Sequence, residues 1–328
     1  MIHVIKENEK LEDIARNYGI SASSILNANR SIAMVANRAI WIPVSKDKRP
    51  AMGFDIGSLP EISLYAMHSP KNDLSRTLEG LQRRAKGVFI DSIFAERNCI
   101  RMFDDFYPVC CSQYYSAQPS FIMKGLGLFM KESNFNSLAT GLKFKEYGGV
   151  LLCIETTDDL MHYEKARDWL YGYGLDVYVC ADSATLLSIG PSSRVEYFFY
   201  KPNTSSFSFS TFKSELGLLS KIFKPESLGY ALSPGAAVIN KNTNIAKYPD
   251  IRQVEKALTK DGISRVLYDS SSKLCIAQYK VNSELHNVVF EDLRSLESKL
   301  AYIREAGIGS LLIESPIALI PAISAIAT

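Results

Sequence analysis

Short apolar runs and longer amphipathic segments alternate along most of the chain. Eight apolar runs have the length of a strand, at residues 62–67, 87–94, 120–126, 149–154, 176–180, 195–200, 227–232 and 309–313. Apolar runs of this length are typical of parallel strands that are buried on both faces. Amphipathic stretches such as Asp159–Tyr171 and Glu291–Glu305 lie between them and predict helices. This order predicts an α/β fold, a (β/α)8 barrel of the TIM type, over residues 61–328.

An open, doubly wound sheet would show the same alternation. Its usual signature is a glycine-rich, phosphate-binding loop after a strand, and no such loop follows any of the eight runs. We therefore expect the closed barrel. The stretch from about residue 240 to residue 289 is extra, and it predicts an inserted α+β lobe. Within it we expect a helix at Ile251–Thr259 and strands at residues 264–268, 274–279 and 288–290.

The first 45 residues have a different pattern, which predicts a small βααβ domain before a linker at residues 46–60. β-Branched residues begin the chain, and a second short apolar run, Ala39–Val44, ends the domain. Apolar residues recur between these runs at spacings of three and four, as on one face of a helix: Leu11, Ile14, Ala15 and Tyr18. Gly19 stands where a left-handed residue would end this helix, and Ser21 where a side chain would cap the next one.

Composition narrows the class of protein. The chain has 328 residues, of which 47% are hydrophobic, and a formal net charge of +2. Basic and acidic residues are nearly balanced without a basic cluster, so we expect no nucleic-acid partner. The most apolar stretch, Ile317–Ala327, is too short for membrane insertion. The first residues lack the basic segment and apolar core of a signal peptide, so we expect synthesis in the cytoplasm.

Six cysteines are spread along the chain, at Cys99, Cys110, Cys111, Cys153, Cys180 and Cys275. They show no paired spacing of the kind found in metal sites, so we expect no metal and no other cofactor. Buried thiols are the simplest expectation, because free cysteine is among the most buried residue types. The adjacent residues Cys110 and Cys111 leave a cross-linking site open as the alternative.

The N-terminal segment resembles a LysM module. The resemblance rests on the spacing of Leu11, Ile14-Ala15, Tyr18-Gly19, Leu26, Asn29 and Ile42-Pro43. It implies a shallow groove for polymers of N-acetylglucosamine between two loops, at residues 7–10 and 30–38. The residues that it implies as glycan contacts are Glu7, Asn8, Glu9, Lys10, Asn29, Arg30 and Asn37.

The chain departs from the LysM pattern in both loops. Asn8-Glu9-Lys10 replaces the usual Gly-Asp-Thr, and Asn37 replaces the usual glycine before the last strand. Glycine allows positive φ and close approach of a ligand to the backbone, whereas asparagine tolerates only part of this. The fold of the module is therefore a firmer expectation than its affinity for glycan.

The C-terminal segment resembles the end of family 18 glycoside hydrolases. The matching residues are Phe290-Glu291-Asp292-Leu293-Arg294-Ser295, the following Lys299-Leu300, and Gly309 before the last strand. A LysM module joined directly to such a barrel resembles the spore cortex-lytic N-acetylglucosaminidases of endospore-forming bacteria. Asp292 and Arg294 are expected to orient the last helix against the inserted lobe, rather than to take part in catalysis.

The same family places its catalytic acid at the end of the fourth strand. Its pattern Asp-x-x-Asp-x-Asp-x-Glu corresponds to Gly148–Glu155, with Glu155 at the position of the proton donor. Residues two apart on a strand face the same side, so Cys153 should point into the barrel and Glu155 should lie at its mouth. The family's carboxylate beside the acid is Cys153 here, and a protonated thiol cannot supply its charge. We therefore expect weak or lost hydrolase activity.

Other side chains follow the proposed strands and are expected at the barrel mouth: His68, Asp182, Tyr200, Asn203 and Glu314. Tyr200 and Asn203 fall where the family has Met-x-Tyr-Asp, but the aspartate is absent. Two of the acids could form a rebuilt catalytic pair, and loop capping or salt bridges are at least equally open roles for each. Cys153 is disfavoured as a nucleophile, because no histidine can be placed beside it.

Three functions remain open from the sequence. The first is a spore-associated protein that binds peptidoglycan or chitooligosaccharide, with spore coat or cortex proteins as further partners. The second is an active cortex-lytic N-acetylglucosaminidase that uses Glu155 as its acid. The third is a structural coat protein. All three imply synthesis in the mother cell and a final place at the spore surface or cortex.

Overall fold

The computed structural model describes residues 2–30, 33–36, 38–43, 63–68, 85–90, 93–96, 99–102, 120–129, 136, 138, 140–142, 147–203, 208–232, 235–241, 243, 246–248, 266–281, 284–291 and 293–313. The predicted linker, the helix expected at Ile251–Thr259 and the pair Cys110 and Cys111 lie outside these residues.

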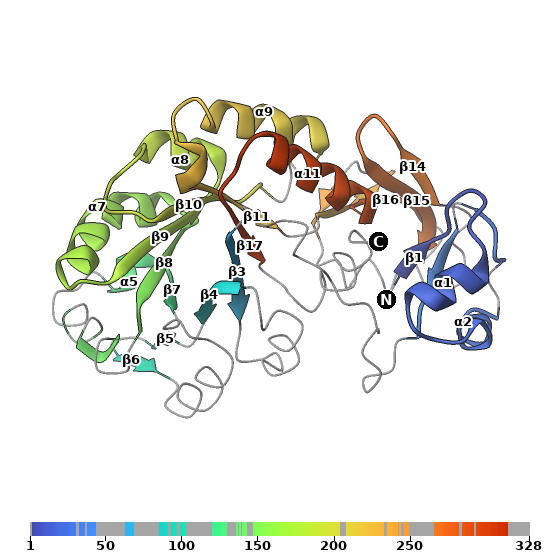
Figure 1. Ribbon diagram of the computed structural model, residues 1–328, viewed down its shortest axis with the longest axis horizontal. Helices are drawn as coiled ribbons and strands as arrows, with labels where there is room; N and C mark the ends of the chain where they lie inside the picture. Colours follow the sequence, from blue (N-terminus) through green and yellow to red (C-terminus); the bar gives the residue numbers. More distant parts are fainter. Residues whose placement is uncertain are drawn as a thin grey trace.

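Within the described residues, eight parallel strands close into a barrel (Figure 1). Going round the barrel they are β3 (Ser63–His68), β4 (Ala85–Ile90), β7 (Ser120–Lys124), β8 (Gly149–Ile154), β9 (Asp176–Ala181), β10 (Tyr197–Tyr200), β11 (Leu228–Leu232) and β17 (Ser310–Ile313). β17 pairs with β3, Leu312 opposite Tyr65, and so completes the ring. Each of the eight apolar runs of the sequence supplies one of these strands.

The expected strand at 87–94 is wrong in its extent. The barrel strand β4 already begins at Ala85 and ends at Ile90. The chain then forms a separate antiparallel hairpin from β5 (Ile93–Glu96) and β6 (Cys99–Met102). β7 is likewise shorter than expected, because Gly125 has a φ of 69° and the short helix α5 (Leu126–Phe129) follows it.

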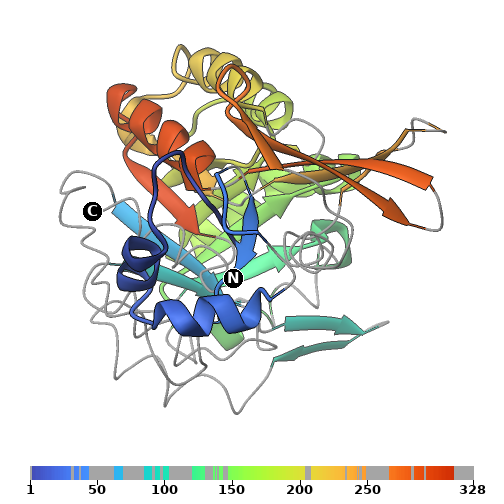
Figure 2. The same ribbon diagram turned by 90° about the vertical axis from the view of Figure 1, so that its right-hand side faces the viewer.

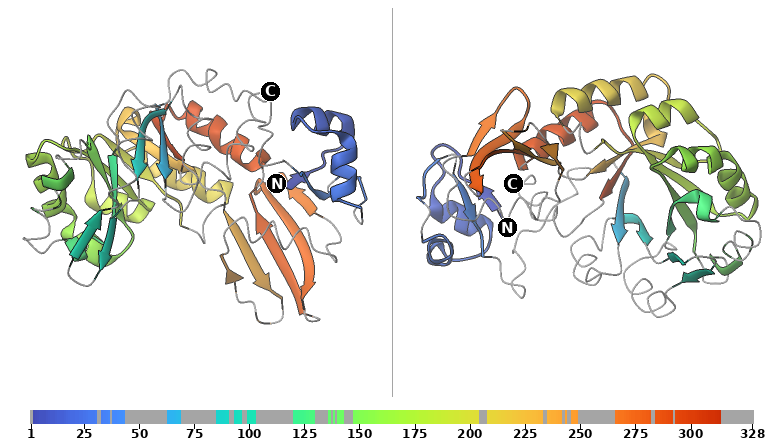
Figure 3. Two further views of the ribbon diagram at one scale, coloured as in Figure 1. Left: turned by 90° about the horizontal axis from the view of Figure 1, so that it is seen from below. Right: turned by 180° about the vertical axis from the view of Figure 1, so that it is seen from behind.

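Helices pack against the outside of the barrel. They include α7 (Thr157–Gly172), α8 (Ser183–Ile189), α9 (Phe209–Leu219) and α11 (Leu293–Glu305), of which α9 and α11 lie next to each other (Figure 3). Alternate strand residues face these helices or the barrel interior, which gives one apolar core outside the strands and a second core within them. No helix in the described parts of the chain has the length and apolar character needed to cross a membrane.

A five-stranded antiparallel sheet stands between β11 and α11 in the chain. Its spatial order is β13 (Ala246–Lys247), β12 (Ala236–Asn240), β16 (Glu284–Phe290), β15 (Leu274–Val281) and β14 (Val266–Asp269). β15 and β16 extend away from the barrel (Figure 2). The sheet begins at Ala236, a few residues before the range expected for an insertion, because β12 pairs with β16 from Ala236 opposite Phe290 onward.

The N-terminal residues form a separate βααβ unit. Its elements are β1 (Ile2–Val4), α1 (Leu11–Asn17), α2 (Ala22–Ala28) and β2 (Ala39–Trp41), and β1 pairs antiparallel with β2. Gly19 has a φ of 61° after α1, and the Ser21 hydroxyl accepts the Ser24 N–H at 3.1 Å to cap α2. The last strand is shorter than expected and ends at Trp41, although Ile42 is still buried in the small apolar core.

Candidate functional site at the barrel mouth

Aromatic side chains fill much of the barrel interior. Tyr65, Phe89, Tyr178 and Phe199 are buried there, and the Phe89 and Tyr178 ring centroids are 4.9 Å apart. A Cβ atom added to Gly229 would lie 2.5 Å from a ring carbon of Phe199, so glycine at that position leaves room for the ring. Burial raises the pKa of Tyr65 and of Tyr178 above the usual range of tyrosine. The interior is therefore a packed, neutral core.

Cys153 belongs to this inner core. Its side chain is 4% exposed, and it lies opposite Cys180 of β9 in the parallel register. Its neighbours in the inner core include aromatic and aliphatic residues. A thiol is a weak hydrogen-bond donor and acceptor. Cys153 therefore offers no strong hydrogen bond at the position where the family 18 resemblance implies a carboxylate.

Glu155 lies at the rim, directly after β8, with its side chain 54% exposed. The ammonium of Lys201, which directly follows β10, is 3.5 Å from its carboxylate. The backbone fixes both residues, because the Glu155 N–H donates to Asp159 Oδ2 at 3.1 Å and the Lys201 N–H to the Ala181 carbonyl at 2.8 Å. Sequence reasoning did not assign Lys201 as the partner of Glu155. Its place directly after Tyr200 at a strand end was the available signal.

Two other carboxylates near this rim cap helices. Asp182 accepts the Thr185 N–H at 2.8 Å and so caps α8. Asp159 is buried, forms a capping box with Thr156 at the start of α7, and accepts the Leu126 N–H at 2.6 Å. Each of these carboxylates satisfies backbone N–H groups, which is a structural use of an acid. Asp182 thus has a structural role, as the cap of a helix rather than of a loop.

Tyr200 does not lie at the mouth, and its prediction is wrong. β10 places Phe199 in the inner core, so the next side chain faces outward between the barrel and α9. Its hydroxyl donates to the carboxylate of Glu215, and the centroid of its ring is 5.7 Å from that of Tyr230. Burial and the hydrogen bond to Glu215 raise the pKa of Tyr200. The prediction failed because a shift of one residue along a strand reverses the side chain.

The other residues predicted at the barrel mouth are His68, Asn203 and Glu314. His68 is the last residue of β3, at the same rim. Asn203 is exposed in the segment after β10. Glu314 lies outside the described residues. Nothing in the described geometry brings these three together with Glu155 into one site.

The glycan contacts expected in the N-terminal unit differ in their exposure. Glu7, Asn8, Lys10 and Arg30 are exposed. Asn29 is 3% exposed and its Nδ2–H donates to the Ile25 carbonyl at 2.7 Å, which removes it from any surface that a glycan could touch. Its prediction as a contact is therefore wrong, and Asn37 lies outside the described residues.

Glu9 ties the first loop to β1. Its carboxylate accepts the Lys6 N–H at 2.8 Å and lies 2.8 Å from Nε2 of His3, whose other ring nitrogen is 3.1 Å from the Tyr18 hydroxyl. Partial burial raises the pKa of Glu9, but the hydrogen bonds from His3 and Lys6 outweigh it and leave the pKa lowered. Asn8 has a φ of 63° and so takes the left-handed conformation that glycine usually supplies.

Comparison with known proteins shows which solved structures have a similar fold. No protein-family model and no curated protein sequence matches the chain. Solved structures do match it, among them the spore cortex-lytic enzyme SleL of Bacillus cereus, with a TM-score of 0.63 and 13% identity over 99% of this chain and 85% of that chain. This likeness shows the fold of the chain, an α/β barrel similar to that of this enzyme.

Two chitinases support the same comparison. The chitinase of Chromobacterium violaceum aligns with a TM-score of 0.59 and 12% identity over 81% of this chain and 98% of its own. The family GH18 chitinase of Cycas revoluta, solved with allosamidin, gives 0.55 and 12% over 80% and 98% of the two chains. Because one fold hosts many functions, these values fix the architecture and leave the function to the site.

Proposed function

We propose that the protein binds a cell-wall glycan, a peptidoglycan or chitooligosaccharide rich in N-acetylglucosamine, and that its barrel has weak or no hydrolase activity. The proposal assigns residues 1–45 to a LysM-like glycan-binding domain, 46–60 to a linker and 61–328 to a family 18-like barrel with an inserted lobe at about 240–289. It places the protein in the spore, at the surface or cortex, with coat or cortex proteins as further partners.

The surroundings of Glu155 carry the proposal. The position two residues before it holds the buried thiol of Cys153 in place of a carboxylate, and the charged side chain 3.5 Å away is the ammonium of Lys201. Hydrolysis assisted by the substrate's acetamide needs a carboxylate that stabilises the cyclising group. Loss of such an electrostatic stabiliser typically costs about a hundredfold to a thousandfold in rate.

The N-terminal unit supplies one glycan-binding surface in this proposal. Its exposed side chains come from both loops that the LysM resemblance implies as the walls of the groove, and Asn8 keeps the left-handed turn despite the missing glycine. The Cycas revoluta chitinase that shares the barrel fold has been solved with (GlcNAc)3, which supports oligomers of N-acetylglucosamine as the class of ligand.

Co-sedimentation with insoluble peptidoglycan and with chitin tests the proposal. The wild-type protein is expected to pellet with at least one polymer. The double variant Lys10→Ala, Arg30→Ala should bind about tenfold more weakly, equivalent to about 1.4 kcal/mol. A matched double variant at the exposed residues Lys221 and Lys224 should bind like the wild type. The proposal would be refuted if the wild type pelleted with neither peptidoglycan nor chitin.

An active N-acetylglucosaminidase is the second candidate function. The observation in its favour is that the likeness to SleL extends over 99% of this chain, while Glu155 stands exposed at the rim. In this case Glu155 would act as the general acid. Release of reducing ends from glycan separates this candidate from a binding protein.

A further inference from the structure

The chain enters and leaves the five-stranded sheet at one point. Gly235 precedes β12 and Glu291 follows β16. The Glu291 N–H donates to the Gly235 carbonyl at 3.0 Å, and the Gly235 N–H donates to Oε2 of the Glu291 side chain at 2.8 Å. These two hydrogen bonds join the start and the end of the sheet at its base, and we call them the clasp. Glu291 takes part in both of them.

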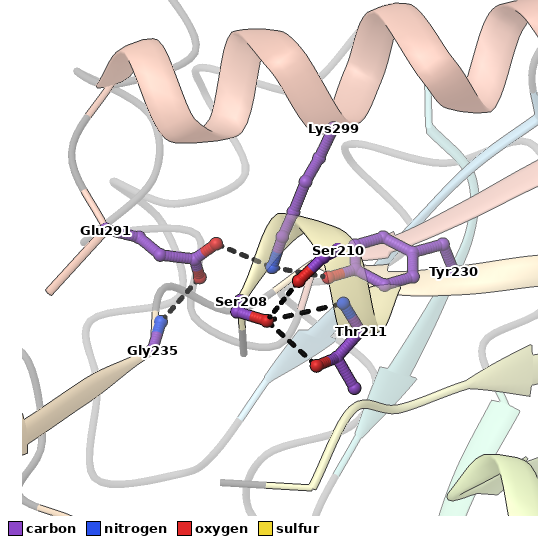
Figure 4. A network of polar contacts seen from close by, with 7 residues as sticks. All are labelled: Ser208, Ser210, Thr211, Tyr230, Gly235, Glu291 and Lys299. Atoms are coloured by element: carbon purple, nitrogen blue, oxygen red, sulfur yellow. Dashed lines mark hydrogen bonds and ion pairs between the residues drawn. The ribbon is translucent and has the colours of Figure 1, made fainter. Parts of the chain in front are cut away.

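Lys299 of α11 holds the other oxygen of this carboxylate. Its Nζ lies 2.5 Å from Oε1 of Glu291 and donates to the Tyr230 hydroxyl on β11 at 3.2 Å (Figure 4). The same Nζ lies 5.4 Å from the centroid of the Phe212 ring on α9. One ammonium therefore joins the sheet, a barrel strand and two helices. From the sequence we expected Asp292 and Arg294 to orient α11. The pair of Glu291 and Lys299 was not predicted.

The stability of the fold does not by itself explain why Glu291 and Lys299 are charged. Both side chains are 1% exposed, and a buried ion pair loses about as much in desolvation as it gains in attraction. Apolar residues of similar volume often serve equally well or better in folding. What a buried pair adds is directional hydrogen bonding, which fixes one arrangement of the elements that it joins.

The clasp lies at the end of the barrel that carries the candidate site. All barrel strands run parallel, so β8 and β11 end at the same rim. Glu155 directly follows β8, and Gly235 comes three residues after the last residue of β11. The sheet therefore leaves the barrel at the rim where Glu155 stands.

We propose that Glu291 and Lys299 are positioning residues, which fix the angle of the five-stranded sheet over the barrel mouth and thereby hold the mouth ready for glycan. The part that concerns glycan rests on the proposed function. The positioning itself does not, and hydrogen exchange without any ligand can measure it. Failure of the two claims can thus be told apart.

The main experiment compares the full-length wild type with the double variant Glu291→Leu, Lys299→Met. Apolar replacement of both charges should keep the melting temperature close to that of the wild type. Hydrogen exchange at the amides of β12 and β16 should nevertheless become about tenfold faster, while exchange in β8 and β9 stays within about twofold. Affinity for chitooligosaccharide should fall with the loss of protection in the sheet.

The single variant Lys299→Met leaves a buried carboxylate without its cation and is expected to lower the melting temperature. Lys213→Met on α9 is the matched control, because Lys213 also lies over aromatic rings, 5.0 Å from the centroid of Tyr302, but is exposed and outside the clasp. The control should leave exchange in the sheet unchanged.

Tyr230→Phe keeps the experiment decisive if the double variant fails to fold. It removes one hydrogen-bond partner of Lys299 without touching a charge. We expect about threefold faster exchange in β12 and β16, with unchanged exchange in β8. Wild-type exchange rates in the sheet of the folded double variant, or of Tyr230→Phe, would overturn the proposal.

Discussion

Replacing Cys153 with aspartate would introduce the carboxylate that the resemblance to family 18 implies at this position. In this barrel the new carboxyl would enter an apolar core, because Cys153 is 4% exposed and belongs to the same buried cluster as Tyr178 and Phe199. Burial disfavours the charged form of a carboxyl, and full burial raises its pKa by about 3 units or more. We therefore expect the variant to be destabilised and to show no gain in glycan hydrolysis over the wild type.

The size of the effect depends on pH. Burying a polar group without a hydrogen bond costs about 1 to 3 kcal/mol even when it is neutral. A folded-state pKa about 3 units above the unfolded value adds about 4 kcal/mol at pH 7, since each unit is worth about 1.4 kcal/mol. Because the folded pKa is raised, the folded state binds the proton more tightly, and stability falls as pH rises from about 4 towards 7.

Urea unfolding of Cys153→Asp at about pH 4.5 and at pH 7 measures this dependence, with Cys153→Asn as the uncharged control of the same shape. We expect the aspartate variant to lose stability between the two pH values and the asparagine variant to show the wild-type dependence. Wild-type stability of Cys153→Asp at pH 7, or a large gain in glycan hydrolysis, would refute the picture of a filled barrel interior.

Three further predictions concern side chains away from the barrel interior. Tyr200→Phe removes the hydrogen bond to Glu215 and should cost about 1 to 3 kcal/mol in urea unfolding, because a half-buried carboxylate loses its partner. Glycan binding should stay unchanged, and weaker binding would contradict the outward placement of Tyr200. Asn8→Ala should destabilise the first loop by about 1 kcal/mol while Asn8→Gly does not, measured by hydrogen exchange in β1 and α1, since the φ there is 63°. Glu9 has a lowered pKa, so its contribution to folding stability is present above about pH 4.3 and is lost as the pH falls below that value. In Glu9→Gln, the melting temperature should therefore depend less on pH in the acid range. An acid dependence like that of the wild type would exclude this role of Glu9.

The sequence predicted the strands of the barrel better than the side chains around it. Apolar runs such as Gly149–Ile154 identify strands because both of their faces are buried, one against the helices and one inside the barrel. Ser21 and Gly19 were also predicted correctly, because helix caps depend on neighbouring residues alone. Local physics of this kind can be read from a short stretch of chain.

The incorrect and missed predictions concern residues whose role depends on tertiary structure. Tyr200 was misplaced because the sequence does not fix which of two adjacent aromatic residues faces inward. The pair of Glu291 and Lys299 was missed because its meaning depends on Tyr230 and Gly235, which the fold brings from distant positions. Whether a buried charge has a partner is a property of the packed molecule rather than of its sequence pattern.

The most direct test of the account compares binding and turnover in the same samples. Wild type and Glu155→Gln are incubated with peptidoglycan and with chitooligosaccharide, and bound protein and released reducing ends are both measured. We predict that both proteins bind equally and that reducing-end release is at or near background for both. Steady release by the wild type that Glu155→Gln abolishes would contradict it and would establish the chain as a hydrolase.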